Sequence, residues 1–161
     1  MECQVCNLFE TILQLLKLFG FFVIQKKLTD VVYILGIFKG GDYLKGRYEC
    51  PPYDRSTMRS VYHVRNLEVF RLKQLESNPP EIMMSHDWPR GIHDYGDTQR
   101  LLRRKQFFAE DIANNQLGSG PAMEVLQTLK PAYWFAGHLH VKFAALVHHE
   151  HTEQDKKGWE A

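Results

Sequence analysis

The sequence predicts an α/β fold, because short apolar segments of strand length alternate with segments of helical periodicity. Three segments rich in β-branched, aromatic or long apolar residues predict buried strands: 31–38 (VVYILGIF), 81–85 (EIMMS) and 132–136 (AYWFA). Two helical patterns separate the last two strands, and strand, helix, helix, strand is the order typical of this fold class. A chain of 161 residues is long enough for one domain, or is a piece of a larger one.

Capping residues set the expected helices of the second half. Asp97 can cap a helix that runs to about Gln116, with Gly118 just beyond it. Ser119 can cap a second helix that runs through Leu129. After the strand 132–136 we expect a turn over 137–140, a strand over 141–147 and a polar tail over 148–161.

The first half is less regular. Polar residues recur at helical spacing over 7–17 and predict an amphipathic helix that ends at Gly20, packed on a core or lying on a membrane surface. The glycines and the Pro-Pro pair of 40–53 predict a long loop. Ser56 can cap a helix over part of 57–76, with an extended conformation of 61–64 as the alternative.

Composition excludes several classes of protein. With 44% hydrophobic and 24% charged residues the chain is globular, and a formal charge of +1 requires no strongly charged partner. The apolar stretch of 8–24 contains charges and is too short to span a bilayer, and no secretory signal accompanies it. Three cysteines do not form a disulfide framework, so we expect a reducing compartment; the zinc-like spacing of Cys3 and Cys6 lacks a second ligand pair and is interpreted as incidental.

Histidines follow two of the predicted strands. His86 comes directly after 81–85, and His138 and His140 come directly after 132–136. Ligands of α/β proteins gather beyond the carboxyl ends of strands, and neutral imidazole is the commonest metal ligand. The pattern therefore indicates shared metal binding, although a polar residue after a strand is more often an ordinary turn residue. Asp87 is a candidate partner that would orient a ligand imidazole, or else faces solvent in the turn.

A basic and aromatic segment covers residues 39–73. It carries eight lysines and arginines against four carboxylates, with four interleaved tyrosines. Cations neutralise phosphates and aromatic rings stack on unpaired bases, so the mixture suits single-stranded or irregular RNA. A solvated loop whose tyrosines pack on the core is the alternative. The candidate RNA-binding residues are Lys39, Asp42, Tyr43, Lys45, Arg47, Tyr53, Arg59, Tyr62 and Arg65.

Over about residues 36–148 the chain resembles the RNA lariat debranching enzymes of eukaryotes. The segments that carry the resemblance are GIFKGGDYLKGRYECPPYDRSTMRSVYHVRNLEVFRLKQL, MMSHDWPRGIHDYGD and NNQLGSGPAMEVLQTLKPAYWFAGHLHVKFAALVHH. GHLH also fits the wider calcineurin-like metallophosphoesterases. The resemblance implies an α/β fold of that class, a β-sandwich flanked by helices with its N-terminal half missing. It divides the chain into an unmatched segment 1–30, a partial metallophosphoesterase domain 31–147 with a lariat-recognition-like loop at about 36–65, and the tail 148–161.

The resemblance also implies an activity and a site. These enzymes hydrolyse the 2′,5′-phosphodiester at the branch point of excised intron lariats, with Fe²⁺, Zn²⁺ or Mn²⁺. Carried over, His86 and His138 match ligands of one metal and His140 a ligand of the other. The implied partner is branched RNA, with no membrane, and the implied location is the nucleus, the cytoplasm remaining open.

Parts of the family's pattern have no match in these 161 residues. The N-terminal Cys- or His-containing metal motif, the bridging aspartate and the Asn-His pair that supplies the catalytic histidine are all unmatched, so no catalytic residue is assigned. We therefore expect weak metal binding, impaired catalysis and a sheet face and edge without their usual cover. A non-catalytic fragment that binds RNA is the alternative function.

Overall fold

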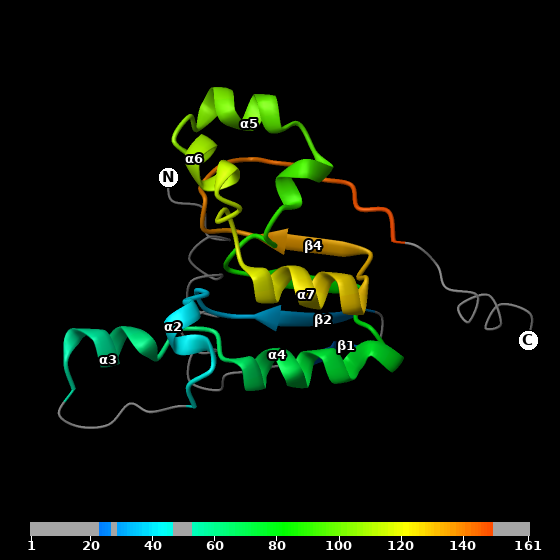
Figure 1. Cartoon of the computed structure of the whole chain (residues 1–161). Coiled ribbons are helices and arrows are strands. Elements are labelled where there is room, and N and C mark those ends of the chain that lie inside the picture. The colour runs from blue at the N-terminus through cyan, green and yellow to red at the C-terminus, as the bar shows by residue number, and fades with distance from the viewer. Residues whose placement is uncertain (1–22, 27–28, 47–52, 150–161) are drawn as a thin grey trace, which may run out of the picture.

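The protein is described by a computed structural model that places residues 23–26, 29–46 and 53–149. The described part contains a four-stranded sheet in the order β1-β2-β3-β4 (Figure 1). β1 pairs with β2 antiparallel, while β2, β3 and β4 run parallel. The strands are β1 (Val23–Lys26), β2 (Thr29–Ile34), β3 (Ile82–Ser85) and β4 (Tyr133–Ala136). The structure thus confirms the α/β class, with a small parallel sheet at its centre.

Helices connect the strands and cover the sheet. The helices are α2 (Gly40–Tyr43), α3 (Arg55–Ser60), α4 (Asn66–Lys73), α5 (Thr98–Arg104), α6 (Phe108–Ala113) and α7 (Gly120–Leu129), with 3₁₀ turns η1 (Gln74–Ser77) and η2 (Ile92–Tyr95). α4 and α7 lie side by side against one face of the sheet, and α5 and α6 lie beyond β4 (Figure 1). Within the described ranges, no helix has the length and apolar character needed to cross a membrane.

The main core lies between the sheet and these two helices. Val32, Met83 and Trp134 are register partners on neighbouring strands and point to the same face. Helix α4 contributes Val69 and Leu72, and α7 contributes Val125 and Leu129, all fully buried. A second cluster forms beyond β4 around Trp88, Leu101, Phe108 and Leu117.

The strand expected over 132–136 forms as β4, but the expectation that it is buried is wrong. In β4 the side chains of Tyr133 and Phe135 are 56% and 55% exposed. Both lie on the sheet face opposite α4 and α7, because side chains alternate along a strand. β4 is also the last strand of the described sheet, so one of its edges lacks a strand partner there.

The strand predicted over 31–38 ends early, at Ile34. Gly36 adopts a φ of +115°, and a Cβ at this position would lie 2.4 Å from the carbonyl oxygen of Tyr62. Past this glycine Ile37 leaves the sheet and pairs with 62–64, accepting from Val64 and donating to Tyr62 at 3.0 Å each. The extended alternative for 61–64 holds only at His63, which bridges to Ile37, because Val61 keeps the α-helical conformation at the end of α3.

In the first half, the predicted loop over 40–53 and the predicted helix cap at Ser56 need correction. The segment expected as a long loop contains the short helix α2, and α3 is capped by Asp54 instead of Ser56. The carboxylate of Asp54 accepts the amide N–H of Thr57 at 2.7 Å, and the Thr57 hydroxyl accepts the Asp54 amide at 2.8 Å. This reciprocal arrangement satisfies two donors that a serine at 56 would not reach. The predicted helix over 7–20 lies outside the described residues.

In the second half the caps are confirmed and one helix is shorter than expected. Asp97 caps α5 and Ser119 caps α7, each accepting an amide three residues on. The helix predicted to reach Gln116 breaks at Lys105, after two arginines that suit the negative end of a helix. The strand expected over 141–147 does not form; within it a single bridge joins Ala145 to Gly96, and a groove separates the segment from β4.

Candidate metal centre

The parallel strands bring three loop segments to one edge of the sheet. β2, β3 and β4 end together, so the residues that follow them meet there. Two backbone hydrogen bonds extend the ladder past the strand ends: His86 donates to Ile34 at 3.3 Å, and Gly137 donates to His86 at 3.1 Å. His86 is thus fixed between the two neighbouring segments.

His86, Asp87 and His138 come together at this edge. One ligand atom from each side chain lies within 4.8 Å of the others, a group that could hold a metal ion. The imidazole rings of His86 and His138 have centroids 4.6 Å apart and are tilted by 44°. The predicted convergence of the two strand-end histidine sites is therefore present in the structure.

Asp87 is buried, with 9% of its surface exposed, and does not face solvent. One carboxylate oxygen accepts the amide N–H of Phe38 at 2.7 Å, and the other contacts Nδ1 of His138. A carboxylate that holds Nδ1–H directs the opposite nitrogen, Nε2, toward a ligand. This geometry favours Asp87 as the group that orients His138.

His140 is not part of this group. His138 and His140 both adopt the left-handed conformation, with φ of 61° and 48°. The chain therefore turns sharply between them, and His140 is exposed at the surface. The sequence resemblance pairs all three histidines with metals, whereas the structure gathers His138 and His86 with Asp87.

The donor set suits a divalent transition metal. Imidazole nitrogens are ligands that Zn²⁺, Fe²⁺ and Mn²⁺ accept, whereas Mg²⁺ and Ca²⁺ prefer oxygen donors. His86 and His138 supply two of the three protein ligands that a catalytic metal usually has, while Asp87 orients the His138 ring. The group is too small to hold two metals.

Two of the candidate RNA-binding residues are buried. The Arg65 guanidinium, 4% exposed, donates to the backbone oxygens of Asp42 at 2.7 Å and Ser60 at 2.9 Å. The Asp42 carboxylate pairs with Nδ1 of His63 at 2.7 Å. These contacts tie α2 to the segment after α3, so both side chains support the structure of this region.

The other described candidates are partly or fully exposed. Tyr43 is half-buried against the core and edge-on to Phe38; burial, with a smaller contribution from Glu124, raises the pKa of its phenol. Arg47 lies outside the described residues. The exposed candidates are Lys39, Lys45, Tyr53, Arg59 and Tyr62.

A concave site lies among these exposed residues. A cavity of about 600 Å³ is lined by Ile37, Lys39, Arg55, Ser56, Arg59, Tyr62 and His63. Sequence reasoning set His63 aside and gave Ser56 only a capping role. The pairing of Ile37 with His63, which no spacing in the sequence reveals, brings these two residues together in the wall of the cavity.

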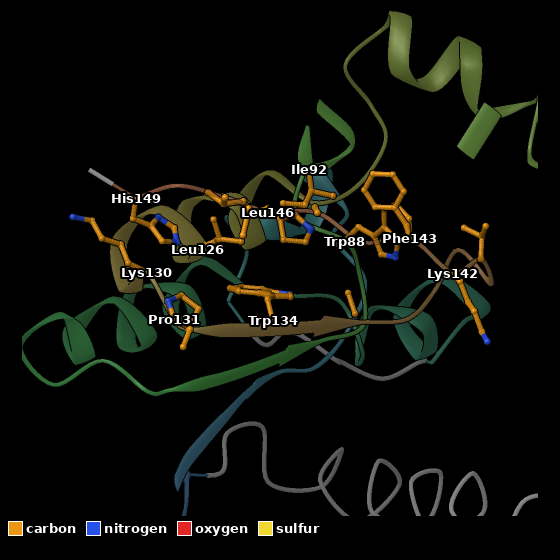
Figure 2. A pocket seen from close by; sticks show the side chains of 16 residues that line it. Trp88, Ile92, Leu126, Lys130, Pro131, Trp134, Lys142, Phe143, Leu146 and His149 are labelled. Carbon is orange, nitrogen blue, oxygen red and sulfur yellow. The ribbon is translucent and has the colours of Figure 1, made fainter. Parts of the chain in front are cut away.

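A separate groove of about 600 Å³ lies between β4 and the segment 141–149 (Figure 2). Trp134 forms its floor, and its indole N–H donates to the Ser85 hydroxyl at 2.8 Å. Trp88, Phe143 and Leu146 lie around it. The three residues of the candidate metal centre do not line this groove.

The chain is similar in sequence to proteins named lariat debranching enzyme. No family model matches it. It is 57% identical over 127 residues to the lariat debranching enzyme of Mus musculus, which covers 79% of this chain and 23% of that protein. The human protein of the same name is 59% identical over 117 residues, 73% of this chain and 21% of that protein. The Schizosaccharomyces pombe protein is 50% identical over 124 residues, 77% of this chain and 27% of that protein. The chain is thus homologous to part of these proteins and spans about a quarter of their length or less.

Proposed function

We propose that this chain is part of a lariat-debranching phosphodiesterase, which hydrolyses the 2′,5′-phosphodiester of branched intron RNA. The observation that carries the proposal is the convergence of His86, Asp87 and His138 in a chain at least 50% identical to enzymes of that name. The residues come from two loops about fifty positions apart, so their meeting depends on the parallel sheet. By the same homology we propose a calcineurin-like metallophosphoesterase fold for the complete domain, and the nucleus as the location.

The proposed roles follow from the geometry. His86 and His138 would hold a divalent metal of the iron, zinc or manganese class through ring nitrogens, and Asp87 keeps the His138 ring oriented. Such a metal, when bound, polarises a phosphodiester oxygen and lowers the pKa of a bound water. His140, on a neighbouring exposed position, stays available for a ligand role once further groups of the domain are present.

Metal titration tests this proposal. His148, His149 and His151 are first replaced by asparagine, so that the tail does not compete. In that background we expect His86→Ala and His138→Ala to abolish Mn²⁺ or Zn²⁺ binding by calorimetry. Asp87→Asn should weaken it by about 10–100-fold, the usual effect of losing a carboxylate behind a ligand histidine. His93→Asn, at a histidine outside the cluster, is the matched control. Equal affinity for all variants would contradict the proposal.

A non-catalytic RNA-binding role is the second candidate. It is favoured by the cationic cavity around Lys39, Arg55 and Arg59, which needs no metal to act. Retained RNA binding by a variant that has lost both metal-centre histidines would support this role independently of catalysis.

A further inference from the structure

We propose that the apolar side of residues 7–20 packs across the sheet face opposite α4 and α7 and covers the aromatic side chains exposed there. The segment belongs to residues 1–30, for which the sequence resemblance has no match, so the proposed function makes no use of it. Three observations point to this contact: the composition of the face, the spacing of residues 7–20 and the place where the segment joins the sheet.

The face opposite α4 and α7 carries six apolar or aromatic side chains over the three parallel strands. Side chains alternate along a strand, and Val32, Met83 and Trp134 point toward α4 and α7. Their neighbours therefore point to the opposite face, where the register aligns two rows: Val31 with Ile82 and Tyr133, and Tyr33 with Met84 and Phe135. Tyr133 and Phe135 are 56% and 55% exposed. A contiguous apolar patch of this kind marks a contact surface.

Residues 7–20 have the pattern and the length to cover these rows. At helical spacing their polar residues share one side, and the opposite side carries Phe9, Ile12, Leu16 and Phe19. A helix over 7–20 extends about 21 Å at about 1.5 Å for each residue, whereas four strands about 4.8 Å apart span about 14 Å between the outer two. The apolar side is therefore long enough to cross the whole sheet.

The segment joins the sheet at an edge strand. Gly20 lies three positions before Val23, the first residue of β1, which pairs with β2. So short a connection keeps residues 7–20 near the sheet, and their packing avoids the loss of translational freedom that a separate partner would suffer. α4 and α7 already occupy one face (Figure 1). The groove above Trp134 lies on that same side, at the end of the sheet far from β1, so the opposite face is the one within reach.

Two other occupants fit the observations less well. A stable interface with a second copy takes about 20–30 residues from each partner, far more than the six side chains of this face. Helices that lie on membranes carry many lysines and arginines on their polar side. The polar side of 7–20 has one acid and one base, Glu10 and Lys17, which favours a protein surface over a lipid one.

The test measures how fast single cysteines react with a thiol reagent in the full chain, after Cys3, Cys6 and Cys50 are replaced by serine. Phe135→Cys places the thiol on the proposed contact face and Phe70→Cys on the outer side of α4. The positions are matched, because Phe135 is 55% and Phe70 59% exposed. Each rate is divided by that of the urea-unfolded chain. We expect the thiol at 135 to react at least about tenfold more slowly, since it becomes accessible only when residues 7–20 open. Equal rates would overturn the proposal.

A charge variant tests whether residues 7–20 are the cover. Ile12→Glu with Leu16→Glu should speed labelling at 135 by at least about fivefold, because carboxylates are unfavourable in an apolar contact, and should leave labelling at 70 unchanged. Thr11→Glu with Gln14→Glu adds the same charge to the polar side, and we expect less than about a twofold effect. The same acceleration by both pairs, or none by the first, would refute the assignment.

Two further measurements distinguish the other occupants. We expect a labelling rate at 135 that does not depend on protein concentration; protection that appears only where sedimentation shows a dimer would assign the face to a second copy. We also expect no effect of vesicles of phosphatidylcholine and phosphatidylserine, and faster labelling at 135 in their presence would assign the apolar side of 7–20 to lipid. Either result would overturn the proposal. No arm uses metal or RNA, so the outcome is independent of the proposed function.

Discussion

His138 has an unfavourable backbone conformation at the point where it meets Asp87. A left-handed residue with a side chain costs about 1–2 kcal/mol, and such residues gather at functional sites. The contact with Asp87 and the hydrogen bond from Leu139 to Gly137 at 2.7 Å keep this turn in place. The conformation turns the imidazole toward His86.

We therefore expect His138→Gly and His138→Ala to separate stability from function. Both should abolish metal binding. Since glycine adopts a positive φ without steric cost, the glycine variant should be about 1 kcal/mol more stable than the alanine variant. Urea unfolding without metal measures the difference. Equal stability of the two variants would show that the left-handed turn carries no strain.

Gly36 is the residue on which the turn after β2 depends. Gly36→Ala combines a positive φ with a Cβ placed 2.4 Å from the Tyr62 carbonyl oxygen, so we expect a loss of more than about 1 kcal/mol. The displacement should also reach Phe38 and its hydrogen bond to Asp87. Gly41→Ala is the control, because no atom lies within 4 Å of its added Cβ. Thermal unfolding of both variants checks the expectation, and similar midpoints would contradict it.

Among the helices and strands, the sequence predicted those elements that depend on local apolar periodicity and capping residues. β3, α7 and the caps Asp97 and Ser119 follow from apolar periodicity and capping residues, and the structure has them. The exposure of β4 could not be predicted, since AYWFA is apolar on both faces and the pattern does not tell which face α4 and α7 cover; Tyr133 and Phe135 lie on the other one. Likewise, the meeting of His86 with His138 follows from the strand order, whereas the positive φ of His140 and the pairing of Ile37 with His63 depend on tertiary contacts.

α3 offers a prediction about an element, because it carries Arg55 and Arg59 on a single capped turn and a half. Asp54→Ala should raise the rate of amide hydrogen exchange in α3 and weaken RNA binding. Asp54→Asn, which can still accept from Thr57, should preserve the slow exchange and the RNA binding.

The same cap predicts a pH dependence. In the wild type the pKa of Asp54 is lowered, chiefly by the Thr57 amide, so its stabilising effect is complete above the ordinary value of 3.8. That effect disappears as pH falls through the lowered pKa. The asparagine variant should lack this acid-dependent change in the Thr57 amide resonance; the same change in the variant would refute the assignment.

The whole molecule combines a well-packed sheet face with an apolar face that lacks cover in the described residues. α4 and α7 bury Val32 and Met83, but on the opposite face Tyr133 and Phe135 remain exposed beside the open edge of β4. Uncovered aromatic faces and free strand edges promote association. The same incompleteness is found at the metal centre, where His86 and His138 supply two donors and Asp87 orients one of them. Both features are what one would expect of part of a longer homologous domain.

The last prediction concerns catalysis: these 161 residues, assayed by themselves, should cleave a 2′,5′-branched RNA negligibly, whatever divalent metal is supplied. Two metals about 3.5–4 Å apart need a group that bridges them against their mutual repulsion. Asp87 cannot serve, since its two oxygens are engaged by Phe38 and His138. Loss of a general acid or base costs a further 10²–10⁴-fold, and no histidine of the chain matches that role. The assay is turnover of a branched oligonucleotide by metal-loaded protein, with the chain lacking His86, His138 and His140 as control. Robust turnover that this variant abolishes would show that the cluster suffices for catalysis and would refute the argument from the missing bridge.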